Sequence, residues 1–386
     1  MTSCTVKHVL RRAGLVGLVA LAWAGGARAD YAAESAKLAA AAPKDAVLYS
    51  MQAGLAALAE GRTDLATPLF DRALTAIESM YTNSENAARA RSLWYEEGAK
   101  DFKGEPYERA MAFYYRGLLY LVDGDYENAR AAFRGGILQD AFAEEGQYQS
   151  DFASLLLLEG WSNQLLGEAG AARDAYQEVL RLRPQWRVPA PGDNTLIIAE
   201  LGGSPRKLGD GIGNHEIVYR RPKRTPESTA DVALDGQPQL LTQVEDVFFQ
   251  ASTRGGRPID AIIDGKVSFK NTADTLGNVL GTVASEGSVI SSASGGGGGR
   301  VLGSLAAVGA IAALVSANVK PRADVRYWAN LPETVLAATL QQHSPITKID
   351  VALRDGAGQP VGDAAPRIHQ WTDRRGNTLI WLKSRN

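Results

Sequence analysis

The chain has 386 residues, of which 45% are hydrophobic and 22% charged, and its formal net charge is -2. These proportions are ordinary for a globular protein, and the length favours two domains over a single hydrophobic core. Lysines and arginines are spread along the chain without a basic stripe, which argues against nucleic acid as a partner.

The first 29 residues have the three parts of a secretory signal peptide. Basic residues between positions 7 and 12 precede an apolar stretch at 13–26, and Ala27-Arg28-Ala29 then matches the A-x-A cleavage pattern. Cleavage between Ala29 and Asp30 is therefore expected. An uncleaved N-terminal anchor is the alternative.

The single cysteine, Cys4, lies within this segment, so the mature chain is expected to have no thiol and no disulfide. A lipoprotein signal needs a cysteine directly after the apolar run, where this chain has Ala29 and Asp30. We therefore predict a protein of the periplasm, with association at the outer membrane as a further option.

Residues 46–184 contain three segments that repeat one template of small and aromatic residues. The segments are Gly54, Gly61, Ala66, Phe70 and Ala73; Gly117, Gly124, Ala129, Phe133 and Gly136; and Gly160, Gly167, Ala172, Tyr176 and Val179. The successive spacings are seven, five, four and three residues in each segment. This template resembles the tetratricopeptide (TPR) repeat, a helical hairpin of about 34 residues.

The spacing has a physical interpretation. The first small residue lets the two helices of a hairpin approach closely, and the next glycine occupies the turn, where a positive φ favours glycine. The alanine and the aromatic residue four positions later share the inner face of the second helix. We therefore predict about three TPR units within residues 30–190, with inserts near 81–106 and 140–151. A generic array of α-hairpins is the alternative.

TPR arrays present a groove that binds peptides or helices of other proteins. Tyr114, Tyr115 and Trp161 are aromatic residues beside the repeat positions, and they are the candidates for contact with a partner. Packing within the core is the other interpretation of these side chains, and the one that the sequence favours.

The composition changes near residues 185–205, where prolines and glycines punctuate the chain. Residues 191–386 are expected to form a β-rich domain. Strands are predicted at Glu216–Arg220, 259–269, 346–354 and Thr378–Lys383, and residues 240–251 fit either a strand or a helix.

This domain is expected to carry an insertion at residues 276–319, made of a glycine-rich linker and an apolar helix. Residues 301–319 lack any charge and are long enough to span a membrane. Their small side chains favour a helix buried in protein, while membrane insertion and disorder are the alternatives.

Residues 323–332 have the pattern A-D-x-R-x-W-x-x-L-P, and residues 103–111 have the pattern K-G-x-x-x-E-x-x-M. With these elements, and shorter ones at 203–207 and 256–260, the chain resembles an uncharacterised family of exported TPR-containing proteins and lipoproteins of the Gram-negative envelope. The resemblance covers most of the mature chain in the same order and implies a role near outer-membrane or peptidoglycan machinery. Many members are lipid-anchored, whereas this chain lacks the required cysteine.

In the 323–332 element, Asp324 and Arg326 are expected to form a salt bridge beside an aromatic ring. Trp328 and Leu331 are expected to be buried, and Pro332 to end the segment. A structural joint is the favoured interpretation, with a ligand site as the alternative.

No catalytic, cofactor-binding or metal-binding residue is predicted. The four histidines lack metal-ligand spacing, and the chain has no G-x-S-x-G element. The glycines at 209–213 and Gly265-Lys266 do not have the spacing of nucleotide-binding loops and are interpreted as turns.

The expected fold class is α+β, with an all-α, TPR-like superhelix followed by a small β-rich domain with a Gly/Ala-rich helical insertion. The expected function is that of a non-enzymatic envelope scaffold, which binds a partner protein or peptide through a TPR groove and needs no cofactor. The alternative is an accessory component of an outer-membrane, secretion or peptidoglycan-synthesis assembly that associates with the membrane through residues 301–319. No oligomeric state is predicted.

Overall fold

The computed structural model describes residues 30–79, 101–141, 151–210, 216–223, 225–253, 323–362 and 365–384. The signal segment up to Ala29, the element at 256–260, the strand expected at 259–269 and the insertion at 276–319 lie outside the described residues, as do most of both predicted inserts. Asp30 caps the first helix, α1 (Tyr31–Ala40), where its side chain accepts a hydrogen bond from the backbone N–H of Ala33.

The N-terminal part of the chain is helical. After α1 come a short 3-10 helix (Pro43–Asp45) and helices α2 (Ala46–Ala59), α3 (Thr63–Ser79), α5 (Pro106–Val122), α6 (Tyr126–Ala141), α7 (Ala153–Leu166) and α8 (Ala169–Leu182). Helices α2 and α3, α5 and α6, and α7 and α8 pack as successive pairs. The predicted α+β class, with a helical N-terminal half and a β-rich C-terminal part, is therefore confirmed.

Each helix pair has a glycine where its two helices are in closest contact. A Cβ atom on Gly54, Gly117 or Gly160 would lie 3.0, 2.2 or 2.5 Å from the ring of Phe70, Phe133 or Tyr176, respectively. The turns between the helices contain Gly61, Gly124 and Gly167, with φ values of 75°, 71° and 83°. The aromatic ring of the second helix thus occupies the space that a side chain on the first helix would need.

The C-terminal part is built from strands. These are β1 (Thr195–Leu201), β2 (Arg206–Asp210), β3 (Glu216–Arg220), β4 (Glu227–Leu234), β5 (Gln237–Gln239), β6 (Thr242–Asp246), β7 (Thr334–Leu340), β8 (Ile349–Asp355), β9 (Arg367–Thr372) and β10 (Thr378–Lys383), with helix α9 (Val247–Thr253) after β6. The main sheet has the order β6-β7-β1-β10-β9, and β5-β4-β8 and β2-β3 form smaller sheets. In the main sheet β1 and β10 pair in parallel, and the other neighbours are antiparallel.

The sequence predicted either a strand or a helix at residues 240–251. The structure has both, since strand β6 leads directly into helix α9. The strand expected at 346–354 is β8, which begins three residues later at Ile349. Strands β1, β2, β4, β5, β7 and β9 were not anticipated. Two of these, β1 and β7, are largely apolar and lack the alternation of a half-exposed strand, because both of their faces are buried.

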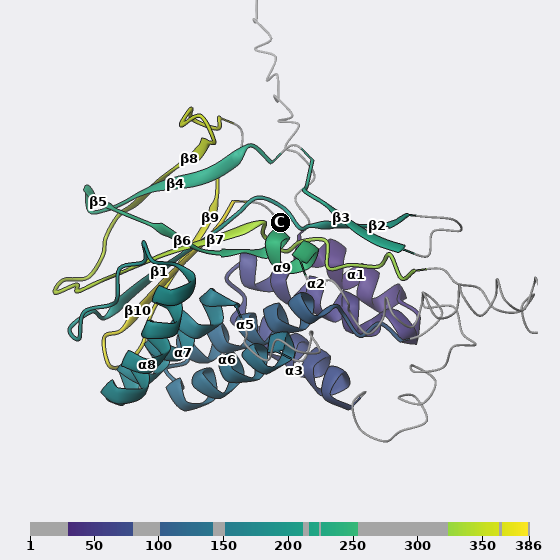
Figure 1. Cartoon of the computed structure of the whole chain (residues 1–386), viewed down its shortest axis with the longest axis horizontal. Coiled ribbons are helices and arrows are strands. Elements are labelled where there is room, and N and C mark those ends of the chain that lie inside the picture. Colours follow the sequence, from purple (N-terminus) through teal and green to yellow (C-terminus); the bar gives the residue numbers. More distant parts are fainter. Residues whose placement is uncertain are drawn as a thin grey trace, which may run out of the picture.

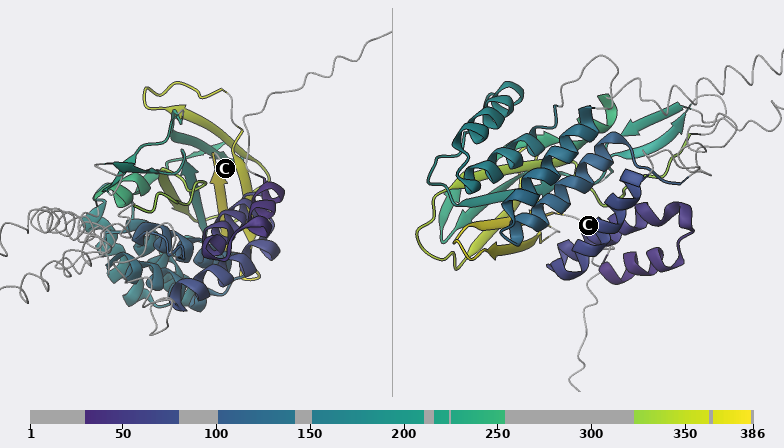
Figure 2. Two further views of the ribbon diagram at one scale, coloured as in Figure 1. Left: turned by 90° about the vertical axis from the view of Figure 1, so that its right-hand side faces the viewer. Right: turned by 90° about the horizontal axis from the view of Figure 1, so that it is seen from below.

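The main sheet is the middle of three layers (Figures 1 and 2). On one face, Leu196 and Trp381 join the hydrophobic core of the helices. On the other face, Ile197 and Ile380 pack against the small sheet that contains β4 and β8. The helical and β-rich parts therefore share a core and form adjoining layers.

The first helix of each pair, α2, α5 or α7, is buried around most of its circumference, whereas α3, α6 and α8 expose their outer sides. The buried helices contact their pair partners on one side and the β-rich part on the other. The first helices, which carry the candidate contact residues Tyr114, Tyr115 and Trp161, are thus covered by the chain's own strands and loops. Among the described residues, no helix is both long enough and apolar enough to cross a membrane.

Candidate functional site

Two of the elements that carry the family resemblance meet in space, although more than 200 residues separate them in the chain. The backbone N–H of Trp328 donates a hydrogen bond of 2.7 Å to Oε1 of Glu108, at a sequence separation of 220. The meeting point lies between the start of α5 and the loop that leads into β7. We call the side chains of Glu105, Glu108, Lys207, Asp324 and Arg326 the charged junction.

The start of α5 explains why Glu108 faces this loop. Glu105 is the N-cap residue, Pro106 occupies the first helical position, and Glu108 completes a capping box. Its Oε2 atom accepts the Glu105 N–H at 2.7 Å, which leaves Oε1 for the N–H of Trp328. One carboxylate thus caps the helix and holds the loop.

A third family-like element, at 203–207, supplies Lys207 from strand β2. Its Nζ lies 2.5 Å from Oε1 of Glu105, and both side chains are buried. Burial lowers the pKa of Lys207, but Glu105, Asp324 and Glu108 together raise this pKa above its ordinary value, so the ammonium is retained.

Burial raises the pKa of Glu108 to about 7, and the charge of Glu105 adds to this effect. Lys207 and the N–H groups of Glu105 and Trp328 act in the opposite direction and lower the pKa. Glu108 therefore changes its charge close to neutral pH, inside a closed contact between helix and loop.

Arg326 makes the outer part of the junction. Its Nη2 atom lies 2.7 Å from Oδ2 of Asp324, and its Nη1 atom lies 2.5 Å from Oδ1 of Asp45, the N-cap residue of α2. The aromatic ring beneath the guanidinium is that of Phe102, with 5.4 Å between the guanidinium carbon and the ring centroid. Arg326 thus ties the loop to both α2 and the segment that enters α5.

The rest of the 323–332 element is packed into the core. Trp328 is fully buried against the rings of Phe70 and Tyr115, Leu331 and Pro332 are buried, and strand β7 starts two residues after the proline. These contacts are those of a structural joint.

A second buried charge lies under the helices, on the central strand β1. Glu200 accepts hydrogen bonds from the Tyr115 hydroxyl at 2.8 Å, the Trp381 Nε1 atom at 2.8 Å, the Tyr114 hydroxyl at 3.2 Å and the Lys383 Nζ atom at 3.3 Å. Burial raises the pKa values of both tyrosines well above their ordinary value and lowers the pKa of Lys383. We call these five side chains the Glu200 cluster.

The sequence left two interpretations for the aromatic residues Tyr114, Tyr115 and Trp161, namely contact with a partner and packing in the core. Tyr114, Tyr115 and Trp161 are all buried, and both tyrosine hydroxyls are bonded to Glu200 within the same chain. The structure thus places the three side chains in the core, where the two tyrosines hold α5 to the sheet.

A third buried glutamate, Glu245 of β6, lies at the start of α7. Its Oε2 accepts the N–H of Ser154 at 3.1 Å, and its Oε1 accepts the Gln250 side-chain amide at 3.0 Å and lies 3.5 Å from Nη2 of Arg183. Burial raises the pKa of Glu245 to about 7, with a further contribution from Asp140, while Arg183 has the largest lowering effect.

The sequence did not single out these buried charges. Glu200 and Lys383 stand at the ends of the apolar runs Thr-Leu-Ile-Ile-Ala and Thr-Leu-Ile-Trp-Leu, and a charge next to such a run is a usable sign of a buried ion pair. Glu108 is the E of the pattern at 103–111, whereas Glu105 falls on one of its unspecified positions.

None of the three glutamate sites has the features of a metal centre. The described residues contain no cluster of His, Cys, Asp and Glu side chains that could hold a metal ion. Nε2 of His369 donates a hydrogen bond of 2.9 Å to the carbonyl of Ala59, and the ring stacks on Trp371 and Trp381. His369 therefore serves the contact between α2 and β9.

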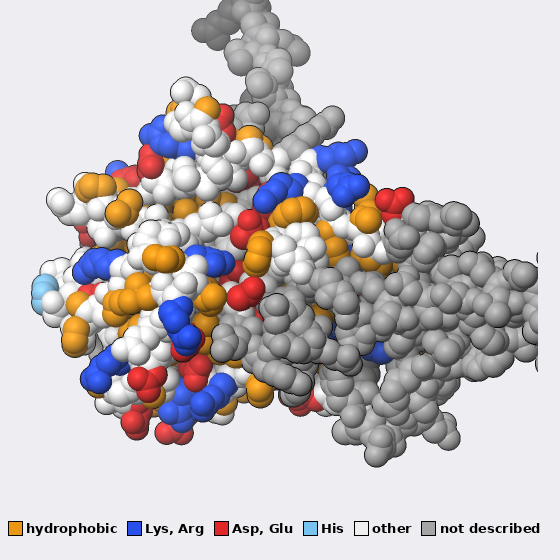
Figure 3. Space-filling view, viewed as in Figure 1, with side chains coloured by type: hydrophobic (Ala, Val, Ile, Leu, Met, Phe, Trp, Pro, Cys, Tyr) orange, Lys and Arg blue, Asp and Glu red, His pale blue; other side chains and the backbone are white. Residues whose placement is uncertain are grey.

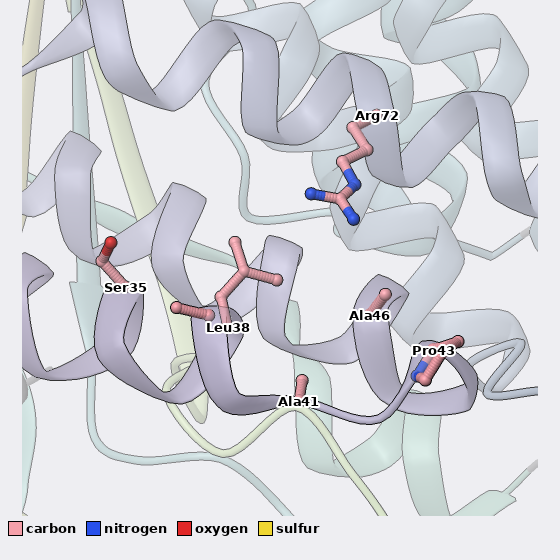
Figure 4. A pocket seen from close by; sticks show the side chains of 7 residues that line it. Ser35, Leu38, Ala41, Pro43, Ala46 and Arg72 are labelled. Carbon is pink, nitrogen blue, oxygen red and sulfur yellow. The ribbon is translucent and has the colours of Figure 1, made fainter.

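An open groove lies apart from these sites, at the N-terminal end of the helices (Figure 4). Its volume is about 670 Å³. It is lined by Ser35, Leu38, Ala39, Ala41, Pro43, Ala46 and Arg72. We call it the α1–α3 groove, because α1 and α3 supply its two sides.

No family model, curated protein or solved structure matches the chain. The family resemblance of its sequence elements therefore stays a prediction, and the proposals below rest on the geometry of the described residues.

Proposed function

We propose that this chain is a non-enzymatic scaffold of the periplasm or cell envelope, which binds a partner protein through the outer surface of its helical array. The observation that carries the proposal is the threefold repetition of one helix pair, with an aromatic ring packed on a glycine in each. Repeated pairs of this kind build extended surfaces, and such surfaces commonly bind proteins. We further propose that the pairs form a TPR-like superhelix, on the basis of the matched spacings and turn glycines.

The contacts of the first helices support an outer rather than an inner binding surface. Tyr115 bonds to β1, Ser154 to β6, and the carbonyl of Ala59 to β9, so each first helix already has an occupant on that side. The second helices α3, α6 and α8 keep an exposed side.

The exposed sides of the helices have a mixed character. Over the helices at the lower left of Figure 3, basic, acidic and apolar side chains are interspersed. On α6, Leu138 is 52% exposed, although it is a large apolar side chain. Apolar residues within a charged surround are a common composition of protein–protein contacts.

The test is photo-crosslinking in cells, with a photoreactive amino acid at Leu138. The matched control is Leu240, an exposed leucine before β6, on the sheet side of the molecule, which is 89% exposed. We expect a discrete crosslinked protein from position 138 and none from position 240. Equal labelling at both positions, or no adduct at position 138, would contradict the proposal.

Fractionation tests the proposed location. We expect the mature chain to leave the cell with the periplasmic contents after osmotic shock, without detergent. Deletion of residues 301–319 should then leave this distribution unchanged. If the intact chain needs detergent and the deletion variant does not, the alternative of a membrane-associated accessory component replaces the soluble scaffold.

A further inference from the structure

The α1–α3 groove combines small apolar walls with one exposed cation. Its volume of about 670 Å³ is within the range of sites that hold peptides and other organic ligands, roughly 300–1,000 Å³. Five of its lining residues are apolar, namely Leu38, Ala39, Ala41, Pro43 and Ala46. Four of these five are alanine or proline, so the main chain of a guest can come close to the walls.

The local sequence explains the shape of the groove. Ser35, Leu38 and Ala39 share one face of α1, because their positions differ by three and four residues. Helix α1 ends at Ala40, and the chain passes through Pro43 before α2 begins at Ala46. The short connection leaves an open space between α1 and the neighbouring turns of α3.

Arg72 of α3 supplies the charge. Its side chain extends from α3 toward the space above Leu38 and Ala46 (Figure 4). Within the part of the chain that the structure describes, its guanidinium has no hydrogen-bonding or ion-pairing partner.

Three acidic side chains on α3 and the neighbouring elements are already paired with other cations. Asp71, next to it on α3, lies 2.6 Å from Nε of Arg116. Asp45 is bound by Arg326, and Glu34 of α1 lies 2.8 Å from Nζ of Lys37. Arg72 is itself exposed, so its charge is accessible to a group from outside the described residues.

We propose that the α1–α3 groove binds an amphipathic helix of a partner protein, with a glutamate or aspartate of that helix paired to Arg72. Apart from Arg72, the hydroxyl of Ser35 is the one polar side-chain group among the lining residues. An extended peptide would bring unpaired N–H and C=O groups into such a groove, whereas a helix satisfies its own backbone hydrogen bonds. This inference rests on the proposed scaffold function and names the chemistry of its partner.

The test uses the mature full chain and three labelled, end-blocked helical peptides of 18 residues. Each peptide has an Ala/Leu stripe, lysines on the opposite face, and Glu, Gln or Lys at the centre of the stripe. In fluorescence anisotropy we expect the Glu peptide to bind about fivefold more tightly than the Gln peptide, the scale of a partly exposed ion pair. The variant Arg72→Glu should reverse this order and prefer the Lys peptide.

Two further variants separate the groove from general effects. Ala39→Phe fills the groove from an exposed position on α1 and should weaken every peptide. Arg173→Ala removes an exposed arginine of α8, away from the groove, and should change nothing. Unchanged binding in Arg72→Glu and Ala39→Phe would overturn the proposal, as would equal losses in Arg173→Ala.

Sedimentation of the same variants identifies a different occupant. If Arg72→Glu or Ala39→Phe converts a dimer into a monomer, the groove belongs to a second copy of the chain, and the partner-helix proposal fails. The crosslink from position 138 is an independent readout: if it persists in Ala39→Phe while peptide binding never occurs, the groove inference is wrong and the scaffold function stands.

Discussion

Replacing Glu200 with alanine is expected to lower the free energy of unfolding by about 3–5 kcal/mol, the usual cost of removing one partner from a buried ion pair. The ammonium of Lys383, the hydroxyls of Tyr114 and Tyr115, and the indole N–H of Trp381 would lose their shared acceptor. Because these donors are buried, water cannot replace the carboxylate without opening the contact between α5 and the sheet. Urea unfolding followed by tryptophan fluorescence measures the loss.

A double variant separates the ion pair from simple packing. Glu200→Leu combined with Lys383→Met removes both buried charges and keeps apolar volume at both positions. This combination should be more stable than Glu200→Ala, since an apolar pair avoids an unpaired buried ammonium. Recovery should be partial, because two tyrosine hydroxyls still lack an acceptor. A loss below about 1 kcal/mol in Glu200→Ala, the size of an average substitution, would show that the cluster does not hold the layers together.

The second large effect is a dependence of stability on pH. The pKa of Glu108 is raised by burial to about 7, and so is that of Glu245, while both groups have the ordinary value of 4.5 when unfolded. Between pH 4.5 and 7 the folded chain holds protons that the unfolded chain has released, so the free energy of unfolding falls as pH rises. Each glutamate should contribute a decrease of about 3 kcal/mol across this window, at roughly 1.4 kcal/mol for each pKa unit. Above the folded pKa the decrease is complete.

The variants Glu108→Gln and Glu245→Gln measure these contributions. Denaturant unfolding between pH 5 and pH 8 should show a smaller pH slope in each variant than in the original chain. The slope is the relevant quantity, because glutamine cannot accept both backbone N–H groups that Glu108 binds and so costs stability at every pH. Glu78→Gln, an exposed position on α3, controls for removal of a carboxylate. If both variants keep the original slope, the two carboxylates are not the proton-binding groups.

The sequence predicted the helical half of the fold better than the β-rich half for a physical reason. Gly117 and Phe133 recur at a fixed local spacing, so the chain itself shows which residues of a hairpin meet. Strand β1 gives no such local sign, because it is buried on both faces and is completed by β7 and β10 from the far end of the chain. The prolines and glycines around β1 indicated only a domain boundary near residues 185–205.

For the same reason, only part of the charged junction could be predicted from the sequence. The pairing of Asp324 with Arg326 is local and could be predicted from a spacing of two residues. The contacts of Glu108 with Trp328 and of Glu105 with Lys207 join residues 220 and 102 positions apart, and a single sequence does not indicate such pairs. The ring under Arg326 likewise belongs to Phe102, from a distant segment, and not to the neighbouring tryptophan of the motif.

The parallel pairing of β1 with β10 sets the order in which the molecule can fold. Thr195 pairs with Thr378 in the middle of the main sheet, so the central strand has no neighbour on that side until almost the last described residue has been made. A chain synthesised from its N terminus must therefore keep the sheet-facing sides of its helices, with Tyr115 among them, unfilled until Trp381 arrives. During that interval the exposed apolar surface favours association with other chains. The helices therefore reach their final packing only after β10 has been made, and a truncation before β10 should yield a protein that aggregates rather than a stable helical half.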